Sequence, residues 1–248
     1  MPSSASKIFG TLMVRSGLAP LLYFGSSRYC TVCNRSSRKF LSFGVRPRPD
    51  ARCPHCGSLE RHRLAIVFFR ERTNLFDGLQ KRFLHIAPEG FFVRMFSEAA
   101  GDGYLTADLR GTGVMESMDI TDIAWPDGTF DVIYCSHVLG HVVDDRQAMR
   151  ELCRVLAPGG WAMLNVPITA SETFEDFSVT DPRERIRQFG QKNHVRRYGP
   201  DYMDRLTAAG FEVRQISVGD LVEAANIERY GLADIASGDL FYCVRQSG

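Results

Sequence analysis

Residues 119–139 read DITDIAWPDGTFDVIYCSHVL, and residues 149–160 read MRELCRVLAPGG. The apolar run at 130–135 predicts a buried strand, and the periodic segment 144–155, which begins with two aspartates, predicts a capped helix. The Pro-Gly-Gly sequence at its end predicts a turn into another strand at 161–166. A strand, a helix and a second strand in this order indicate two parallel strands with a covering helix.

The same alternation continues on both sides of this stretch. Further strands are expected at 83–87, 104–107, 115–120, 211–216 and 240–245, and further helices at 91–100 and 201–209. The pattern indicates an α/β fold, in which helices cover a largely parallel sheet.

Two acidic residues follow the first two of these strands. Glu89 lies in the first loop, and Asp108 closes the second strand 19 residues later. In βαβ units, an acid about 20 residues beyond the first loop accepts hydrogen bonds from the ribose hydroxyls of a nucleoside. An isolated aspartate after a strand is otherwise a turn residue. The spacing therefore favours a nucleoside-binding site at Asp108.

Residues 82–245, most specifically the two stretches quoted above, resemble class I S-adenosylmethionine-dependent methyltransferases of the type 11 kind. The resemblance implies a Rossmann-like sheet of seven strands in the order 3-2-1-4-5-7-6, with the seventh strand antiparallel. It also implies S-adenosylmethionine as the cofactor. The implied binding residues are Asp108 at the ribose with Leu109 next to it in sequence, Asp119 and Ile120 at the adenine, and Ser136 and His137 at the methionine end.

One loop departs from the family pattern. The family reads D-x-G-x-G-x-G after the first strand, whereas this chain has His85 at the position of the first acid and Ala87 and Glu89 at those of two glycines. Because glycine lets the backbone approach a cofactor closely, we expect a different contact here, with Glu89 near the ammonium of the methionine moiety. The candidate loop residues are His85, Ala87, Pro88, Glu89 and Gly90. A degenerate site in a non-catalytic protein is the alternative.

Three histidines, His137, His141 and His194, are candidate catalytic bases. Methyl transfer is an in-line displacement, in which the protein positions a nucleophile and removes its proton. His137 and His141 share a face if their segment is helical; alternatively, His141 only caps or packs there. The segment resembles the E-x-x-E-H of ubiquinone-pathway O-methyltransferases, which implies a second, divalent metal held by the three histidines. Both family glutamates are missing, with His137 and Gly140 in their places.

Residues 167–199 form an insertion between the fifth strand and the next helix. Its 33 residues exceed what a connection requires, and class I methyltransferases commonly build the substrate lid at this position. Arg196 and Tyr198 are expected to face the substrate beside His194, because a guanidinium suits a carboxylate or a phosphate. Alternatively, the insertion only docks the N-terminal module.

Four of the seven cysteines form two C-x-x-C pairs separated by 19 residues, Cys30 with Cys33 and Cys53 with Cys56. This spacing is typical of a tetrahedral zinc ribbon. Four thiolates leave no open coordination position, so the zinc would be structural; four unligated thiols are the alternative. The predicted organisation is an N-terminal extension (1–27), a zinc ribbon (28–58), a connecting helix (59–81) that Ser58 caps, and a cofactor domain (82–248).

Charge divides the chain near the same place. Residues 1–82 contain 15 basic and 4 acidic residues, a net charge of +11, whereas residues 83–248 carry −10. An internal interface between the two parts explains this charge more simply than a nucleic-acid partner does. The leading hypothesis is therefore O-methylation of a small-molecule or sugar acceptor, anionic or polyhydroxylated. RNA methylation through the basic ribbon, and a non-catalytic regulator that binds the cofactor, are the alternatives.

The sequence also predicts a cytoplasmic protein. No apolar run approaches the length of about 20 residues that crosses a bilayer. Lys7 and Arg15 interrupt the apolar residues at the N-terminus, which argues against a signal peptide. The odd number of cysteines fits reduced thiols better than a disulfide framework.

Overall fold

The computed structural model describes residues 19–44, 47–233 and 238–246. Most of the predicted N-terminal extension, including Lys7 and Arg15, lies outside these residues. The chain divides into two compact units: Met1–Phe76 with Ser217–Gly238, and Asp77–Ile216 with Asp239–Gly248. The predicted cofactor domain begins at residue 82, whereas the second unit begins at Asp77, and residues 217–238 group with the cysteine-containing part of the chain.

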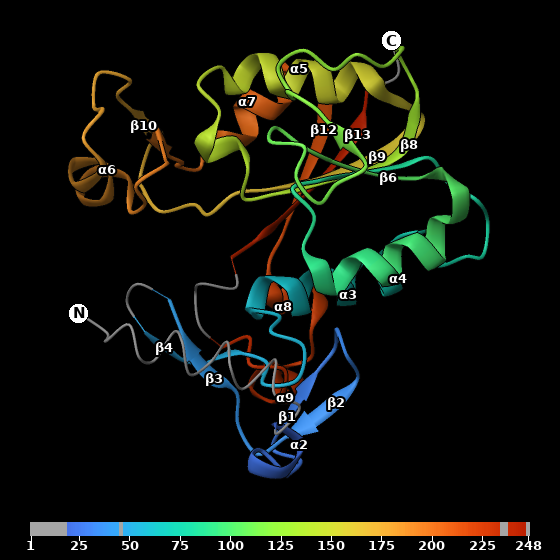
Figure 1. The fold of residues 1–248 in the computed structure, drawn as a ribbon, viewed down its shortest axis with the longest axis vertical. Helices are drawn as coiled ribbons and strands as arrows, with labels where there is room; N and C mark the ends of the chain where they lie inside the picture. The colour runs from blue at the N-terminus through green and yellow to red at the C-terminus, as the bar shows by residue number, and fades with distance from the viewer. Residues whose placement is uncertain (1–18, 45–46, 234–237, 247–248) are drawn as a thin grey trace. The chain divides into compact units, whose positions relative to one another are not determined.

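The second unit is built on a seven-stranded mixed sheet with the order β12-β13-β9-β8-β5-β6-β7 (Figure 1). The strands are β5 (Phe83–Ile86), β6 (Tyr104–Asp108), β7 (Glu116–Ser117), β8 (Phe130–Ser136), β9 (Leu156–Asn165), β12 (Phe211–Ile216) and β13 (Leu240–Arg245). Numbered along the chain and taken from the β7 edge, this order corresponds to the predicted 3-2-1-4-5-7-6. As predicted, the seventh strand, β13, is antiparallel to both of its neighbours.

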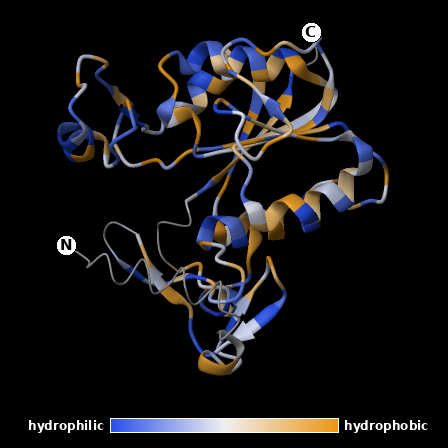
Figure 2. Cartoon of the chain, in the orientation of Figure 1, coloured by the Kyte–Doolittle hydropathy of each residue, from blue (hydrophilic) through white to orange (hydrophobic). Residues whose placement is uncertain are grey.

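Alternate side chains of the parallel strands pack on opposite faces of this sheet. Figure 1 shows α5 (Asp145–Val155) and α7 (Tyr202–Ala208) on one face and α4 (Gly90–Ala100) on the other. Leu84 belongs to the hydrophobic core that includes residues of α5 and α7, whereas Phe83 and His85 contact Phe96 of α4. Because both faces are covered, most residues of the central strands are buried, and Figure 2 shows hydrophobic segments among the strands of the sheet.

Two strands differ from the prediction. β7 spans two residues instead of 115–120, since it is an edge strand that pairs only with β6. β9 begins at Leu156, before the Pro-Gly-Gly sequence, because Leu156 pairs with Phe130 and the register then shifts before Trp161 pairs with Val132. Gly159 adopts φ 76° in this irregular stretch. The sequence that we expected to be a turn before the strand is therefore an irregularity within it.

The insertion has secondary structure of its own. β10 (Phe174–Glu175) and β11 (Arg196–Arg197) pair as an antiparallel ladder, and α6 (Pro182–Phe189) lies between them in sequence. The side chain of Asp181 accepts hydrogen bonds from the first amides of α6, and Gly190 ends the helix at φ 81°. Residues 167–199 are therefore a folded element.

The first unit contains short antiparallel ladders and a longer helix. Its elements are α2 (Ala19–Leu22), β1 (Arg28–Cys30), β2 (Arg35–Ser37), β3 (Leu41–Phe43), β4 (Arg48–Arg52), α3 (Glu60–Arg72), α8 (Val218–Leu221) and α9 (Ala224–Arg229). β1 pairs with β2, and β3 with β4. The first α3 turns are buried on nearly all sides, so α3 is a core helix of this unit.

Arg63 explains why residues 217–238 belong to this unit. Its guanidinium, fully buried on α3, donates to the carbonyls of Tyr230 at 2.6 Å, Gly231 at 3.0 Å and Ala51 at 3.0 Å. It also lies 4.4 Å from the ring centroid of Phe40. The arginine therefore joins the returning segment to the β3–β4 ladder, and it does not face an anion.

In the described part of the chain, none of the helices combines the length and the apolar character that a bilayer crossing requires.

Candidate functional site

The predicted cofactor residues follow the carboxyl ends of four neighbouring parallel strands. β5 pairs with both β6 and β8, and β6 pairs with β7, so these ends lie along one edge of the sheet. Ile86 is opposite Ala107 on one side and Cys135 on the other. Ligands of open α/β sheets bind at such an edge, where helices leave in opposite directions. The structure therefore brings the predicted loops together.

The loop after β5 follows a strained path. Ala87 adopts φ 49°, a left-handed conformation that favours glycine, and its amide donates to the carbonyl of Ala107 at 2.8 Å. After the neighbouring strand β8, His137 adopts φ 59°. Strained non-glycine residues cost about 1–3 kcal/mol each and concentrate at functional sites. Two of them thus follow adjacent strands at the same edge.

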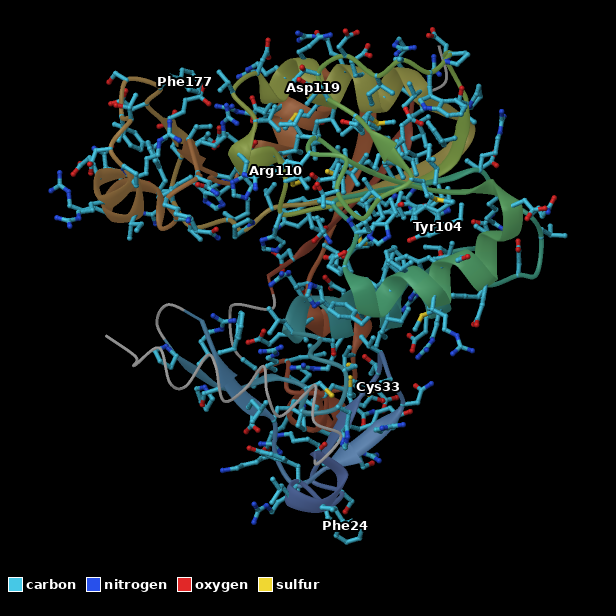
Figure 3. The ribbon with its side chains drawn as sticks, in the orientation of Figure 1. Phe24, Cys33, Tyr104, Arg110, Asp119 and Phe177 are labelled. Carbon is cyan, nitrogen blue, oxygen red and sulfur yellow. The ribbon has the colours of Figure 1, made fainter. Side chains whose placement is uncertain are left out.

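His85 and Glu89 connect this loop to the face of the sheet beneath α4. The imidazole of His85 is fully buried, with Nδ1 2.8 Å from the hydroxyl of Tyr104 and Nε2 3.1 Å from Oε2 of Glu89. Glu89 is the residue before α4, yet its side chain makes no capping hydrogen bond. Tyr104, labelled in Figure 3, was not among the predicted site residues. No sequence motif marks it, because its role depends on pairing between β5 and β6.

The residues after β6 and β7 present both acidic and apolar groups. Asp108 is partly exposed, and its Oδ1 accepts from the amide of Arg110 at 3.0 Å. Leu109, next to it, is 67% exposed. Asp119 is exposed and accepts from the amide and the hydroxyl of Thr121, whereas Ile120 is buried. Arg110 and Asp119 are labelled in Figure 3. An exposed leucine next to the carboxylate of Asp108 suits a ligand with polar and apolar parts.

Ser136 ends β8 and contributes a buried hydroxyl. Its side chain is 8% exposed, and its oxygen has no hydrogen-bond partner among the described residues. The next amide, that of His137, donates to the carbonyl of Asn165 at 2.7 Å. Because a buried hydroxyl without a partner carries a desolvation cost, Ser136 has capacity to bind a polar ligand atom.

His137 and His141 would share a face only if their segment were helical, and the helix does not extend to His137. The 3₁₀-helix η2 (Leu139–His141) begins only after the left-handed turn at His137, so the two residues do not share a helical face. His141 instead packs edge-on against His194, with ring centroids 4.5 Å apart. The ring of His141 is exposed, and its Nδ1 lies 3.1 Å from the carbonyl of Asn193.

His194 is a buried member of this pair. It is 7% exposed, and its Nδ1 lies 3.3 Å from the carbonyl of Phe189. Burial, followed by the neighbouring His141, lowers the pKa of His194 to about 4. The ring is therefore neutral near pH 7 and poorly suited to accept a proton from a substrate.

Arg196 and Tyr198 do not face a substrate, contrary to the prediction. Arg196 is 1% exposed and donates to the carbonyls of Leu139 at 2.9 Å and Val143 at 2.7 Å, and also to that of Val142. The same side chain donates to Glu175 at 2.9 Å. All of these partners are internal, so Arg196 holds the segment that carries His141.

Tyr198 belongs to the same internal network. It is 2% exposed, and its hydroxyl donates to Oδ2 of Asp145 at 2.7 Å. Arg205 donates to the same oxygen at 3.0 Å and to Glu175 at 3.1 Å. Arg197, between Arg196 and Tyr198, is only partly buried. The residue types did not show that the side chains of Arg196 and Tyr198 point inward.

The four cysteines of the ribbon gather as predicted (Cys33 is labelled in Figure 3), with all sulfur atoms within 4.8 Å of one another. The Sγ atoms of Cys30 and Cys56 are 3.7 Å apart, and those of Cys33 and Cys53 are 3.8 Å apart. Four thiolates at about 2.3 Å from a tetrahedral zinc ion would be about 3.8 Å from one another. The sulfur arrangement therefore fits such an ion.

The backbone around the cysteines forms two similar turns. The carbonyl of Cys30 accepts from the amide of Asn34 at 2.8 Å, and that of Cys53 accepts from Gly57 at 3.0 Å. Asn34 and Gly57 adopt φ 56° and 80°. Each C-x-x-C pair is thus followed by one left-handed residue that closes its turn.

Ser58 was expected to cap the connecting helix, but Leu59 precedes α3. The Ser58 hydroxyl lies instead 3.2 Å from the sulfur of Cys30 and 3.1 Å from that of Cys56. His62 accepts from the amide of Leu59 through Nδ1, and so it takes part in the helix start.

Among the described residues, the four cysteines are the one group of three or more potential metal ligands that lie this close together. His137, His141 and His194 do not form such a group. The structure therefore does not support the second metal site that the ubiquinone-pathway resemblance implied.

Three comparisons with known proteins found similar sequences and structures. Residues 98–164 match a family model described as a methyltransferase domain. The 27-O-demethylrifamycin SV methyltransferase of Amycolatopsis mediterranei is 30% identical over 119 residues, which cover 46% of this chain and 41% of that protein. The probable methyltransferase ltbC of Aspergillus luteorubrus is 28% identical over 156 residues, or 57% and 54% of the two chains. This chain thus spans about half the length of the curated relatives that it matches.

A solved structure from Mesorhizobium loti, an S-adenosylmethionine-dependent methyltransferase, aligns with 68% of this chain and 92% of its own, at 19% identity and a TM-score of 0.47. The matched segment 98–164 contains the β6, β7 and β8 loops described above. The family match and the names of the two curated relatives all describe methyltransferases.

Proposed function

We propose that this protein transfers a methyl group from S-adenosylmethionine to a hydroxyl group of a small-molecule acceptor. One observation carries the proposal: Asp108, Asp119 and Ser136 follow successive strands at one edge of the sheet, inside the segment that matches the methyltransferase domain. A nucleoside needs carboxylates for its ribose and an apolar surface for its base, and this edge supplies both.

The residues at this edge fit the cofactor. Asp108 would accept from the ribose hydroxyls, and Leu109 and Ile120 would contact the adenine beside Asp119. Ser136, whose hydroxyl has no partner among the described residues, would bind a polar atom of the amino-acid end. When bound, S-adenosylmethionine supplies a methyl group on a sulfonium, which is reactive toward a correctly placed oxygen. The contribution of the chain is to position that oxygen and remove its proton.

His141 is the candidate base. A backbone carbonyl only accepts hydrogen bonds, so Nδ1 of His141 carries the proton toward Asn193, and Nε2 keeps its lone pair. The ring is exposed and held by a segment that Arg196 fixes. His141 would therefore take the proton of the acceptor hydroxyl, with the buried His194 as its packing partner.

The acceptor class follows from the relatives and from the buried arginine. The name of the Amycolatopsis relative describes methylation of a small molecule at an oxygen. We extend this acceptor class, a hydroxylated small molecule or sugar, to the present chain. We do not extend it to anions, because Arg196, which would have bound them, is occupied by internal carbonyl groups.

RNA is a less suitable acceptor, since several arginines of the first unit have internal partners. Arg28 pairs with Asp50 at 3.0 Å, Arg48 pairs with Glu60 at 3.1 Å, and Arg63 is bonded to carbonyls. These contacts reduce the positive charge that phosphates would meet.

We further propose that Cys30, Cys33, Cys53 and Cys56 bind a structural zinc ion. The sulfur spacing and the two matching turns support it. Ser58 would donate a hydrogen bond to the thiolates, and such outer contacts orient the ligands of a metal. With four sulfur ligands the ion has no position for substrate, so its role is to fold the ribbon.

The test of the methyltransferase proposal is calorimetric titration with S-adenosylhomocysteine, the demethylated cofactor. The unmodified chain should bind it, and Asp108→Ala should weaken binding by about 10- to 100-fold. Asp102→Ala, which removes an exposed carboxylate before the amino end of β6, should leave the affinity unchanged. Absence of binding by the unmodified chain would contradict the proposal. Transfer of a labelled methyl group to hydroxylated small molecules, compared with transfer to RNA, would then separate the acceptor classes.

A further inference from the structure

An imidazole is buried where an apolar side chain would be expected. His85 is 0% exposed, and its ring centroid is 5.3 Å from those of Phe96 and Tyr134. A buried polar ring requires partners for both of its nitrogens, since each unpaired one is costly in such surroundings. Both nitrogens of His85 have a partner, and the partners come from different elements.

The proton arrangement of this network follows from its chemistry. An ionised carboxylate only accepts hydrogen bonds, so Nε2 of His85 carries the proton and donates to Glu89 at 3.1 Å. With this proton on Nε2, Nδ1 accepts, and the Tyr104 hydroxyl donates to it at 2.8 Å. Burial, together with the charge of Glu89, raises the pKa of Tyr104, so the hydroxyl keeps its proton. Tyr104, His85 and Glu89 thus form a one-way series of donors.

The carboxylate at the end of this series lies at the edge of the proposed site. Glu89 precedes the first turn of α4, where the helix dipole stabilises a negative charge, but its side chain turns back to His85. It is 17% exposed, so the series runs from a buried ring to a partly accessible carboxylate.

We propose that Tyr104 and His85 are positioning residues that aim the Glu89 carboxylate at the α-ammonium group of the methyl donor. This inference rests on the proposed function. A charge-assisted hydrogen bond to a cation is strongest when the carboxylate is held in a fixed direction. The hydrogen bond from Nε2 of His85 fixes the direction of the Glu89 carboxylate. The Tyr104 hydroxyl, by donating to Nδ1, keeps the proton of His85 on Nε2.

The test compares two ligands by calorimetry: S-adenosylhomocysteine and an analogue of it that lacks the α-amino group. The unmodified chain should bind the analogue about 10- to 100-fold more weakly, since a charge-assisted hydrogen bond is lost. Glu89→Gln should weaken binding of S-adenosylhomocysteine and leave that of the analogue unchanged, so that the ratio of affinities approaches one. Tyr104→Phe, which removes only the first donor, should give an intermediate ratio.

Two control variants separate positioning from stability. Glu98→Gln neutralises an exposed carboxylate on the same helix, which pairs with Arg94. Tyr202→Phe removes another buried tyrosine hydroxyl, which donates to the carbonyl of Leu164. Both should keep the ratio of the unmodified chain, even where thermal stability falls.

The outcomes distinguish the two proposals. If the unmodified chain binds neither ligand, the proposed function fails, and this inference fails with it. If it binds S-adenosylhomocysteine but does not discriminate against the analogue, the ammonium contact is wrong. If Glu89→Gln abolishes the discrimination and Tyr104→Phe preserves it in full, the positioning role is overturned while the carboxylate contact stands.

Discussion

Replacing Tyr198 by phenylalanine removes one buried hydroxyl and tests whether this residue is structural. The hydroxyl donates to Oδ2 of Asp145 at 2.7 Å, an oxygen that also accepts from Arg205. Burial, followed by the charge of Asp145, raises the pKa of Tyr198 well above its ordinary value, so the group donates throughout the accessible pH range. The variant leaves a buried carboxylate with one donor fewer.

The expected loss of stability can be compared with that of a neighbouring tyrosine. A hydrogen bond to a charged group contributes about 1.5–3 kcal/mol, so Tyr198→Phe should lower the free energy of unfolding by about 2 kcal/mol. For a unit of this size, that corresponds to a fall in melting temperature of about 4–8 °C. Tyr202 packs against Tyr198, with ring centroids 4.7 Å apart, and its hydroxyl donates to the neutral carbonyl of Leu164. Tyr202→Phe should therefore cost only about 1 kcal/mol.

Urea unfolding followed by tryptophan fluorescence measures both variants in the relevant unit. The two tryptophans of the chain, Trp125 and Trp161, both belong to the second unit. The KM for a methyl acceptor should not change in Tyr198→Phe. A raised KM with unchanged stability would indicate that Tyr198 contacts the substrate. Equal losses of stability in Tyr198→Phe and Tyr202→Phe would refute the larger contribution expected from the charged acceptor, Asp145.

Three further predictions concern the ribbon and the histidine pair. Elemental analysis should find one zinc ion per chain, and the Cys53→Ser variant should lose it. Cys153→Ser, in which the replaced cysteine lies outside the cluster, should keep it. Zinc that is retained by Cys53→Ser would contradict the assignment. His141→Ala should lower turnover by about 10²- to 10⁴-fold at unchanged S-adenosylhomocysteine affinity, and an unchanged rate would exclude His141 as the base. Folding lowers the pKa of His194 from 6.5 to about 4. Between these two pH values the His194 ring is protonated mainly in the unfolded chain, so the free energy of unfolding should decrease as the pH falls through this range. In urea titrations His194→Gln should flatten this dependence, whereas an undiminished slope would assign it to other groups.

Periodicity in the sequence was sufficient to predict most of the second unit. The last two strands, Phe211–Ile216 and Leu240–Arg245, have the predicted bounds, because their alternating and apolar residues are bounded by clear turns. The strand that begins at Leu156 was predicted too late, since its first pairing precedes the Pro-Gly-Gly irregularity. Local patterns do not reveal such a register shift, which depends on the neighbouring strand.

The arrangement of the first unit was harder to predict. The cysteine spacing indicated the cluster, because the ligands of a ribbon lie on short local turns. The association of residues 217–238 with the same unit depends on Arg63, whose carbonyl partners Tyr230 and Gly231 are distant in sequence. No composition or periodicity identifies such partners.

The candidate site was predicted unevenly for the same reason. Strand ends locate Asp108 and Ser136, since parallel strands bring their carboxyl ends to one edge. Arg196 and Tyr198 have the composition of a substrate site, yet their side chains point inward to Asp145 and to backbone carbonyls. Residue type showed that these groups need polar partners, and only the three-dimensional structure shows that the partners are internal.

The most direct test of the central proposal is a crystal structure of this protein with S-adenosylhomocysteine. We expect the ligand at the carboxyl edge of β5, β6 and β8, with its ribose hydroxyls on the carboxylate of Asp108 and its sulfur near Ser136 and His137. Ligand density elsewhere on the chain, or at this edge with the ribose away from Asp108, would contradict the proposed site.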